Sequence, residues 1–161
     1  MKAREHNGSI TTYNSLPETW NGTSGHIVNF RNASTDVIEA EGFYDVQNPD
    51  GYDARIHNLT TLSFDSENSV FVYSKTNKTW SETLAELKTN KISSLKSIYN
   101  SKLSKTDWII VRDAELGNTT EQSVKDSRAA LRTECATKES EINALTSKAN
   151  VITYQLPNLN V

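Results

Sequence analysis

Cysteine, proline and methionine are scarce in this chain. Its 161 residues include three prolines, one methionine and a single cysteine, Cys135. One cysteine cannot form an internal disulfide, which excludes a small fold held together by disulfides. Cys135 falls on the apolar face of a predicted helix and has no histidine near it in sequence. This setting favours a small core residue over a reactive thiol.

Long hydrophobic runs are also missing. No stretch of about 18 apolar residues occurs, so we expect no membrane-spanning helix. No apolar run follows residues 1–6, so we expect no export signal. Six Asn-X-Ser/Thr triplets would fit a secreted glycoprotein, but asparagine, serine and threonine are abundant throughout and make such triplets by chance. The triplets begin at Asn7, Asn21, Asn32, Asn58, Asn77 and Asn118.

The chain has no surplus of positive charge. Its net charge is -3 at pH 7. Residues 1–80 hold six basic and ten acidic side chains, a net of -4, and residues 81–161 hold eleven and ten, a net of +1. Neither half has a basic stripe that would neutralise a row of phosphates. We therefore expect no nucleic-acid partner and, without a membrane span, no membrane partner.

No catalytic constellation is evident. His6, His26 and His57 have no metal-ligand spacing with one another or with a carboxylate. A nucleophile elbow, a phosphate-binding glycine loop and a dinucleotide fingerprint are all missing. The carboxylates of Asp113 and Glu115 would point in different directions on a helix, so they do not suggest an acid–base pair. We expect no enzyme activity, metal or cofactor; a hydrolase with a site assembled from distant residues is the enzymatic alternative.

The apolar content is modest. Hydrophobic residues make up 35% of the chain and the mean hydropathy is -0.60. These values predict a thin core and a chain that depends on a partner to bury its apolar faces. The pattern along the chain predicts an α+β fold: a small, mainly antiparallel β unit over residues 1–78, then a helical hairpin or three-helix region over 79–161 with a final strand at 151–154.

Alternating segments predict the strands of the first unit. Residues 1–9 are expected to be loose, strands are expected at 9–13, 27–30, 43–46 and 52–59, and 62–64 forms a hairpin with 70–73. In that hairpin Phe64, Val70 and Val72 are expected on one side, with Phe71 and Tyr73 on the other. Trp20 lies in a turn-rich segment and is expected to pack onto the sheet; an exposed anchor for a partner is the alternative.

One short helix is predicted within the β unit. Ser34 is placed to cap a helical turn over 35–41, and Gly42 is placed to end it. Val37, Ile38 and Ala40 supply its expected buried side.

Two long helices are predicted in the second unit. Thr79 and Glu82 fit a capping box, and a long amphipathic helix follows, carrying Leu84, Leu87 and Leu95 on one side. A later helix opens at Glu121. In it, Val124, Leu131, Lys138 and Leu145 form one heptad row, and Arg128, Cys135, Ile142 and Ala149 form another. These rows fit either a short coiled coil or, the interpretation we favour, packing against the first long helix.

Between them lies the stretch 104–117, around which the second unit is organised. Ser104 or Thr106 can cap a helix, Asp107 suits its positive end, and Gly117 can end it. Trp108, Val111 and Ala114 then share one face. We expect this helix to form a hairpin with the helix that opens at Glu121, and Trp108 to anchor the inner seam between the two. The competing interpretation is a strand, because Ile109, Ile110 and Val111 are β-branched.

The segments 103–108, 112–115 and 127–132 together resemble a motif of bacteriophage tail proteins, of the tail assembly chaperone or tail-fibre assembly type. That motif has a Thr/Ser-Asp-Trp opening and a helix reading Tyr-Arg-x-x-Leu-Arg. Arg128, Leu131 and Arg132 match its end, whereas Ser127 stands where an aromatic residue is usual. A looser similarity to phage tail reading frames covers residues 27–75.

The resemblance implies a non-enzymatic virion protein or assembly factor that docks on tail-fibre or baseplate subunits. Its location would be the virion tail, and the host cytoplasm during assembly. Trp108, Arg112, Arg128 and Arg132 would be the partner-binding residues, because Trp and Arg are enriched at interface hot spots. The alternative is that these arginines pair with Asp107, Asp113 or Glu115 and simply hold the hairpin closed.

Two further hypotheses concern assembly and ligand. The heptad rows of residues 124–149 would allow a homo-oligomer, and a trimer would match fibre symmetry. In a second class, the chain is a receptor- or glycan-binding module of the tail. Its aromatic side chains on a β surface, Trp20, Tyr44, Tyr52 and Tyr73, would then stack on sugars.

Overall fold

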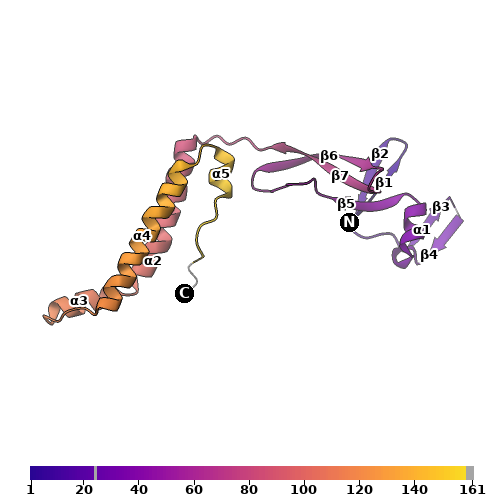
Figure 1. Ribbon diagram of the computed structural model, residues 1–161. Coiled ribbons are helices and arrows are strands. Elements are labelled where there is room, and N and C mark those ends of the chain that lie inside the picture. Colours follow the sequence, from indigo (N-terminus) through magenta and orange to yellow (C-terminus); the bar gives the residue numbers. More distant parts are fainter. Residues whose placement is uncertain (24, 159–161) are drawn as a thin grey trace. The chain divides into compact units, whose positions relative to one another are not determined.

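The computed structural model describes residues 1–23 and 25–158. It has the predicted α+β class, with two β-sheets followed by helices (Figure 1). The chain divides into two compact units, Met1–Lys78 and Thr79–Val161.

The first unit is built on a five-stranded sheet with the order β2-β1-β5-β7-β6 (Figure 1). Neighbouring strands are antiparallel except β5 and β7, which are parallel. The single parallel pair arises because β6 takes the outer position and the chain returns as β7 between it and β5. The strands are β1 (Lys2–His6), β2 (Ser9–Tyr13), β5 (Phe43–Gln47), β6 (His57–Asp65) and β7 (Val70–Asn77).

Strand β1 corrects the prediction that residues 1–9 are loose. It lies between β2 and β5, and Ala3 within it is fully buried. The run Lys-Ala-Arg-Glu-His has only one apolar residue, so its hydrophobic pattern does not predict a strand. Pairing on both sides fixes it instead, and Lys2 adds an ion pair with Asp45 of β5 at 3.2 Å.

The predicted β6–β7 hairpin is present, but its faces were assigned wrongly. Phe64 lies directly opposite Phe71, and their ring centroids are 5.1 Å apart. Residues that oppose each other across two strands share a face, so Phe64 belongs with Phe71 and not with Val70 and Val72. The sequence pattern could not give this register, which depends on how the turn aligns the two strands. The predicted strand at 52–59 begins only at His57.

A buried hydrophobic cluster of the first unit consists of Leu16, Phe30, Ile38 and Phe43, and Ala3 and Phe71 are buried as well. Around this cluster lie a two-stranded sheet, β3 (Thr19–Gly22) and β4 (Gly25–Val28), the short helix η1 (Phe30–Asn32) and α1 (Thr35–Ala40). The expected extended run at 27–30 therefore ends at Val28. Trp20 packs edge-on against Phe43 with 4.8 Å between centroids, which confirms that it packs onto the sheet.

Helix α1 buries less than expected. Ser34 is its N-cap but makes no side-chain capping bond, and Ile38 is its one buried residue. Val37 and Ala40 are exposed, contrary to the prediction, because a helix of six residues presents only one turn to the core.

The second unit is a pair of long helices, α2 (Leu84–Ser104) and α4 (Gln122–Ala144), which lie side by side (Figure 1). Leu95, Tyr99 and Ile142 form their core, and Leu131 and Cys135 pack against it. Residues of the heptad rows thus pack against the first long helix, which is the interpretation favoured over a coiled coil. The helix α3 (Asp107–Glu115) lies between α2 and α4 in sequence, and α5 (Lys148–Thr153) follows them.

Two predicted features of this unit are wrong. The capping box is formed by Thr83 and Glu86, one turn after Thr79 and Glu82, because it directly precedes the periodic apolar run of α2. The expected final strand at 151–154 is mostly the helix α5. Its β-branched residues favour a strand, but Ser147 caps the helix by accepting from the Asn150 N–H at 3.1 Å, and Val151 is buried.

Candidate docking site at the end of the helical hairpin

Helix α3 lies at the end of the α2–α4 hairpin that is remote from α5 (Figure 1). The stretch is a helix and not a strand, with Thr106 as N-cap residue and Asp107 in the first turn. Thr106 makes no side-chain capping bond; its hydroxyl donates to the Leu103 carbonyl at the end of α2. The start of α3 is therefore tied to the end of α2.

Arg128 of α4 holds this corner. Its guanidinium donates to the Leu103 carbonyl at 2.7 Å, to the Thr106 hydroxyl at 2.5 Å and to the Asp107 carboxylate at 2.7 Å. The Arg128 side chain is only 11% exposed. A planar, always charged fork suits a carbonyl, a hydroxyl and a carboxylate at once. Arg128 thus joins α2, α3 and α4. Its pairing with Asp107 is one of the ion pairs expected if the arginines hold the helices together.

The other end of α3 is fixed by a glycine turn. Gly117 has φ +67°, and the Asn118 N–H donates to the Asp113 carbonyl at 2.8 Å, while the Gly117 N–H donates to the Ala114 carbonyl at 3.3 Å. This pair of bonds is the Schellman motif. It needs a residue that adopts positive φ without strain, and glycine supplies it.

A buried carboxylate lies just inside that turn. The Asp113 side chain is almost completely buried, and it accepts from Arg112 at 2.7 Å and 3.0 Å. The Arg112 guanidinium, and then the Thr120 hydroxyl, hold the pKa of this carboxyl below its usual value. Thr120 is itself buried. The sequence suggested Asp113 as an ion-pair partner but did not show that it and Thr120 are buried.

The opposite face of α3 is exposed and apolar. Trp108 is 58% exposed, Val111 54% and the adjacent Leu116 66%. Arg112 lies over the Trp108 ring, with 5.0 Å between its guanidinium carbon and the ring centroid. The prediction that Trp108 anchors the seam of a hairpin between α3 and α4 is therefore wrong. The long hairpin is formed by α2 and α4, and the buried side chain of α3 is Asp113, not Trp108.

The structure brings together three of the four predicted site residues. Trp108 and Arg112 stack on the exposed face, and Arg128 clamps the start of the same helix. Arg132 lies one turn further along α4 and is exposed, and its side chain makes no hydrogen bond or ion pair within the described residues. The exposure of Val111 and Leu116 was missed, although the spacing of Trp108 and Val111 does place them on one face.

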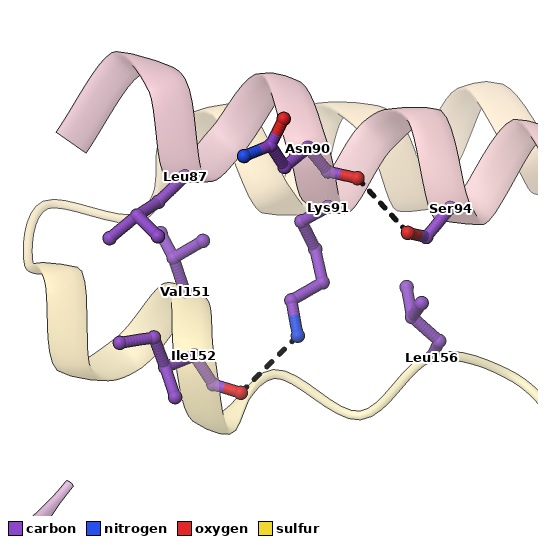
Figure 2. Close-up of a pocket in the computed structure, with 7 residues that line it drawn as sticks. All are labelled: Leu87, Asn90, Lys91, Ser94, Val151, Ile152 and Leu156. Atoms are coloured by element: carbon purple, nitrogen blue, oxygen red, sulfur yellow. Dashed lines mark hydrogen bonds between the residues drawn. The ribbon is translucent and has the colours of Figure 1, made fainter. Parts of the chain in front are cut away.

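A pocket lies beside α2, where residues of α5 and Leu156 pack against that helix (Figure 2). Its volume is about 260 Å³. Lys91 extends through it and donates to the carbonyls of Ile152 at 3.2 Å and Tyr154 at 3.3 Å. Lysine satisfies carbonyls at the end of α5 in this way, so this pocket is a structural contact. Its lining residues are Leu87, Asn90, Lys91, Ser94, Val151, Ile152 and Leu156.

Features of other kinds of site were sought in the same residues. Across residues 1–23 and 25–158, no three His, Cys, Asp or Glu side chains gather where they could hold a metal ion. Within that part of the chain, no helix has the length and apolar character needed to cross a membrane. The Cys135 thiol packs against the α2–α4 core, and burial raises its pKa.

In comparisons with known proteins, no family model, no curated protein and no solved structure matched this chain.

Proposed function

We propose that this chain is a non-enzymatic bacteriophage tail protein that docks on tail-fibre or baseplate subunits. It acts as a virion component, as an assembly factor, or as both in succession. Its location is the virion tail, and the host cytoplasm during assembly. The observation that carries the proposal is the exposed apolar face of α3, where Arg112 covers the ring of Trp108.

The energetics of α3 support docking through this face. Covering Trp108 and Val111 of the nine-residue helix α3, together with the adjacent Leu116, would be favourable, since burying an apolar side chain contributes about 1.5–3 kcal/mol. The helix is already held at both ends, by Arg128 and by the Gly117 turn. A partner would therefore meet a preorganised surface and would not have to order it.

The resemblance to bacteriophage tail proteins suggests the kind of partner, a tail subunit. The Thr-Asp-Trp opening is Thr106-Asp107-Trp108, and in this chain it forms the corner that presents Trp108. Arg128 of the matched Arg-x-x-Leu-Arg segment supports that corner, and the exposed Arg132 is available to an acidic partner. The motif residues therefore divide into a support, Arg128, and a contact surface, Trp108, Arg112 and Arg132.

The alternative, a receptor- or glycan-binding module, has weaker support. Trp20 is half-buried, and its ring packs against Phe43 and Phe30, so little of it is free to stack on a sugar. Tyr44, Tyr52 and Tyr73 are half-buried, and Tyr44 packs against Phe64 with 4.7 Å between centroids. Binding of the purified chain on a glycan array, lost on a Tyr44→Ala change, would favour this alternative.

The test is mass spectrometry of purified phage particles from a strain that encodes this chain, alongside the infected lysate. A stoichiometric copy number in particles supports a virion component. Abundance in the lysate in complex with a fibre or baseplate subunit, without presence in particles, supports an assembly factor. Absence from particles and from every complex with tail subunits would overturn the proposal.

A further inference from the structure

Strand β2 is an open edge of the five-stranded sheet. It pairs with β1 on one side and with no other strand in the described part of the chain. Natural proteins protect such edges with charged residues, prolines or bulges. The other edge, β6, has an irregularity of register between Leu59 and Leu62. The sequence of β2, Ser-Ile-Thr-Thr-Tyr, has no charge and no proline, and its pairing with β1 is regular over all five residues.

The hairpin turn determines which backbone groups of β2 are unpaired. Asn7 and Gly8 both have positive φ, +53° and +75°, and His6 lies opposite Ser9. This is a two-residue type I′ turn, in which the flanking pair exchanges hydrogen bonds. Bonded and non-bonded pairs alternate in an antiparallel ladder, so Ser9, Thr11 and Tyr13 bond to β1. The N–H and C=O groups of Ile10 and Thr12 therefore point away from the sheet.

We propose that β2 pairs antiparallel with β2 of a second copy of this chain, around a two-fold axis at Thr11. In this register Ile10 lies opposite Thr12 of the second copy, and Thr12 opposite its Ile10. These are the two residues whose backbone groups face outward, so both pairs can exchange hydrogen bonds. The same patch serves on both copies, as a two-fold interface requires.

The side chains of β2 are compatible with this pairing. Thr11 meets its own counterpart, and Thr–Thr pairs are favourable across strands. Ile10 meets a threonine, so β-branched side chains oppose each other at each step of the central register. The nearest charged residue on the face of Thr11 is Arg4, one strand further in on each copy. No like charges oppose each other directly across the new contact.

The choice of a second copy, and not a strand of a different protein, rests on this self-complementarity. The five-residue edge is symmetric about Thr11 both in its outward backbone groups and in its lack of charge. The contact is small, so the dimer forms at high protein concentration. One consequence is bivalency: a dimer carries two α3 surfaces, which strengthens binding to a partner that repeats its own site. The pairing itself does not depend on the proposed tail function.

Sedimentation equilibrium of the full chain over a wide concentration range tests the proposal. The wild-type chain is expected to pass from monomer to dimer as its concentration rises. Thr12→Pro removes the outward N–H and spares the ladder with β1, so it should abolish the dimer while circular dichroism and the unfolding midpoint stay near those of the wild type. Thr12→Val, the matched control, keeps the N–H and should keep the dimer.

A charge exchange at the two-fold axis provides a second measurement. Thr11→Glu faces Arg4 within its own chain but places two carboxylates together in the dimer, so it should be monomeric. Thr11→Arg alone should also be monomeric, and an equimolar mixture of the two variants should dimerise in a salt-sensitive way. A wild-type chain that stays monomeric at every concentration would overturn the proposal. So would a dimer that survives both Thr12→Pro and Thr11→Glu.

Discussion

Arg128 and Asp107 are 21 positions apart in sequence, yet the Arg128 guanidinium lies 2.7 Å from the Asp107 carboxylate. The bond joins the second turn of α4 to the first residue of α3. Because the same guanidinium also reaches the Leu103 carbonyl and the Thr106 hydroxyl, a single side chain fixes the corner between α2 and α3. The orientation of the exposed face of α3 depends on this corner.

Replacing Arg128 should therefore destabilise the helical unit. Arg128→Met leaves the Leu103 carbonyl and Asp107 without their donor, and we expect a loss of about 1.5–3 kcal/mol in the free energy of unfolding. Arg132→Met, one turn away and exposed, is the matched control and should change it by less than about 0.5 kcal/mol. Urea unfolding of both variants measures the difference; equal effects would contradict the clamp.

The two tryptophans Trp108 and Trp20 should respond oppositely to truncation. Trp108→Ala removes a mostly exposed ring, so we expect a stability loss below about 1 kcal/mol, chiefly from its contact with Arg112. Trp20→Ala removes a ring packed on Phe43 and should cost about 3–5 kcal/mol. Thermal unfolding measures both changes. Pull-down of tail subunits should then fail for Trp108→Ala although that variant is folded. Unfolding of Trp108→Ala would instead assign Trp108 a structural role.

Gly22→Ala should destabilise the first unit. A Cβ atom at position 22 would lie 1.9 Å from Oε2 of Glu41. That carboxylate is buried and accepts from the Trp20 indole at 3.2 Å and the Thr23 N–H at 2.9 Å, so it has little room to move. We expect a loss of about 1–3 kcal/mol, as for other overpacked sites.

The matched control for this change is Gly8→Ala. No atom lies within 4 Å of the Cβ position there, so only the strain of positive φ remains. Chemical denaturation, followed by Trp20 fluorescence in a background where Trp80 and Trp108 are replaced by Phe, reports on this unit. A Gly22→Ala protein as stable as the unchanged chain would show that Glu41 rearranges freely.

Acid should weaken the end of α3 through Asp113. Its pKa is held below the usual 3.8, first by the Arg112 guanidinium. A depressed pKa in the folded state means that ionised Asp113 stabilises the fold above the ordinary carboxyl pKa, and that this contribution is lost as the pH falls through the folded-state value. We expect Asp113→Asn to be less stable than wild type near neutrality, with a gap that closes below pH 3.8. Unfolding midpoints measured against pH would contradict this if the gap stayed constant.

Alkali should weaken the same unit through Tyr99 and Tyr154. Burial raises the pKa of each phenol from 10.0 to about 12. A raised pKa means that the neutral phenols stabilise the fold fully below about pH 10, and that this contribution is lost as the pH rises through about 12. Absorbance of the phenolate, recorded together with helical circular dichroism, should show both tyrosines ionising as the helices unfold.

Phenylalanine variants separate these two tyrosines. Tyr154 donates to Glu141 at 2.6 Å, so Tyr154→Phe loses a hydrogen bond and should lower the unfolding midpoint. The Tyr99 hydroxyl is buried, and although Glu134 is near enough to raise its pKa, no hydrogen bond to it forms in the described residues, so Tyr99→Phe should leave the midpoint unchanged or raise it. Equal destabilisation by both changes would contradict this reading of the two sites.

Local signals in the sequence were sufficient wherever the deciding contacts lie within a few residues. The helix at 107–115 follows from Asp107, whose charge suits the positive end of the helix dipole, and from Gly117, whose turn satisfies carbonyls at the end of the same helix. The long helix from residue 84 and the β6–β7 hairpin were likewise predicted from local sequence patterns. The wrong capping box shows the limit of such signals, because Thr79-x-x-Glu82 and Thr83-x-x-Glu86 are equally good patterns.

The candidate site was only partly predictable. Trp108 and the three arginines could be selected as residue types suited to an interface, but the sequence could not say which of them face solvent. It placed Trp108 in the seam, where hydrophobicity alone would put it. Only the packed structure shows that α4 pairs with α2 through Leu95, Tyr99 and Ile142, and that Trp108 is left exposed on α3.

By itself, then, the sequence determined the α+β class, most helices and the β6–β7 hairpin, because caps, turns and periodicity act between near neighbours. Tertiary structure decided that Lys2–His6 is a strand, that Val151 lies in a helix, that Phe64 faces Phe71 and that Trp108 points outward. Each of these depends on residues distant in sequence: a pairing strand, a packing helix or, for Trp108, the pairing of α4 with α2. Local propensity is worth less than about 1 kcal/mol per residue, and burial or pairing against a distant partner outweighs it.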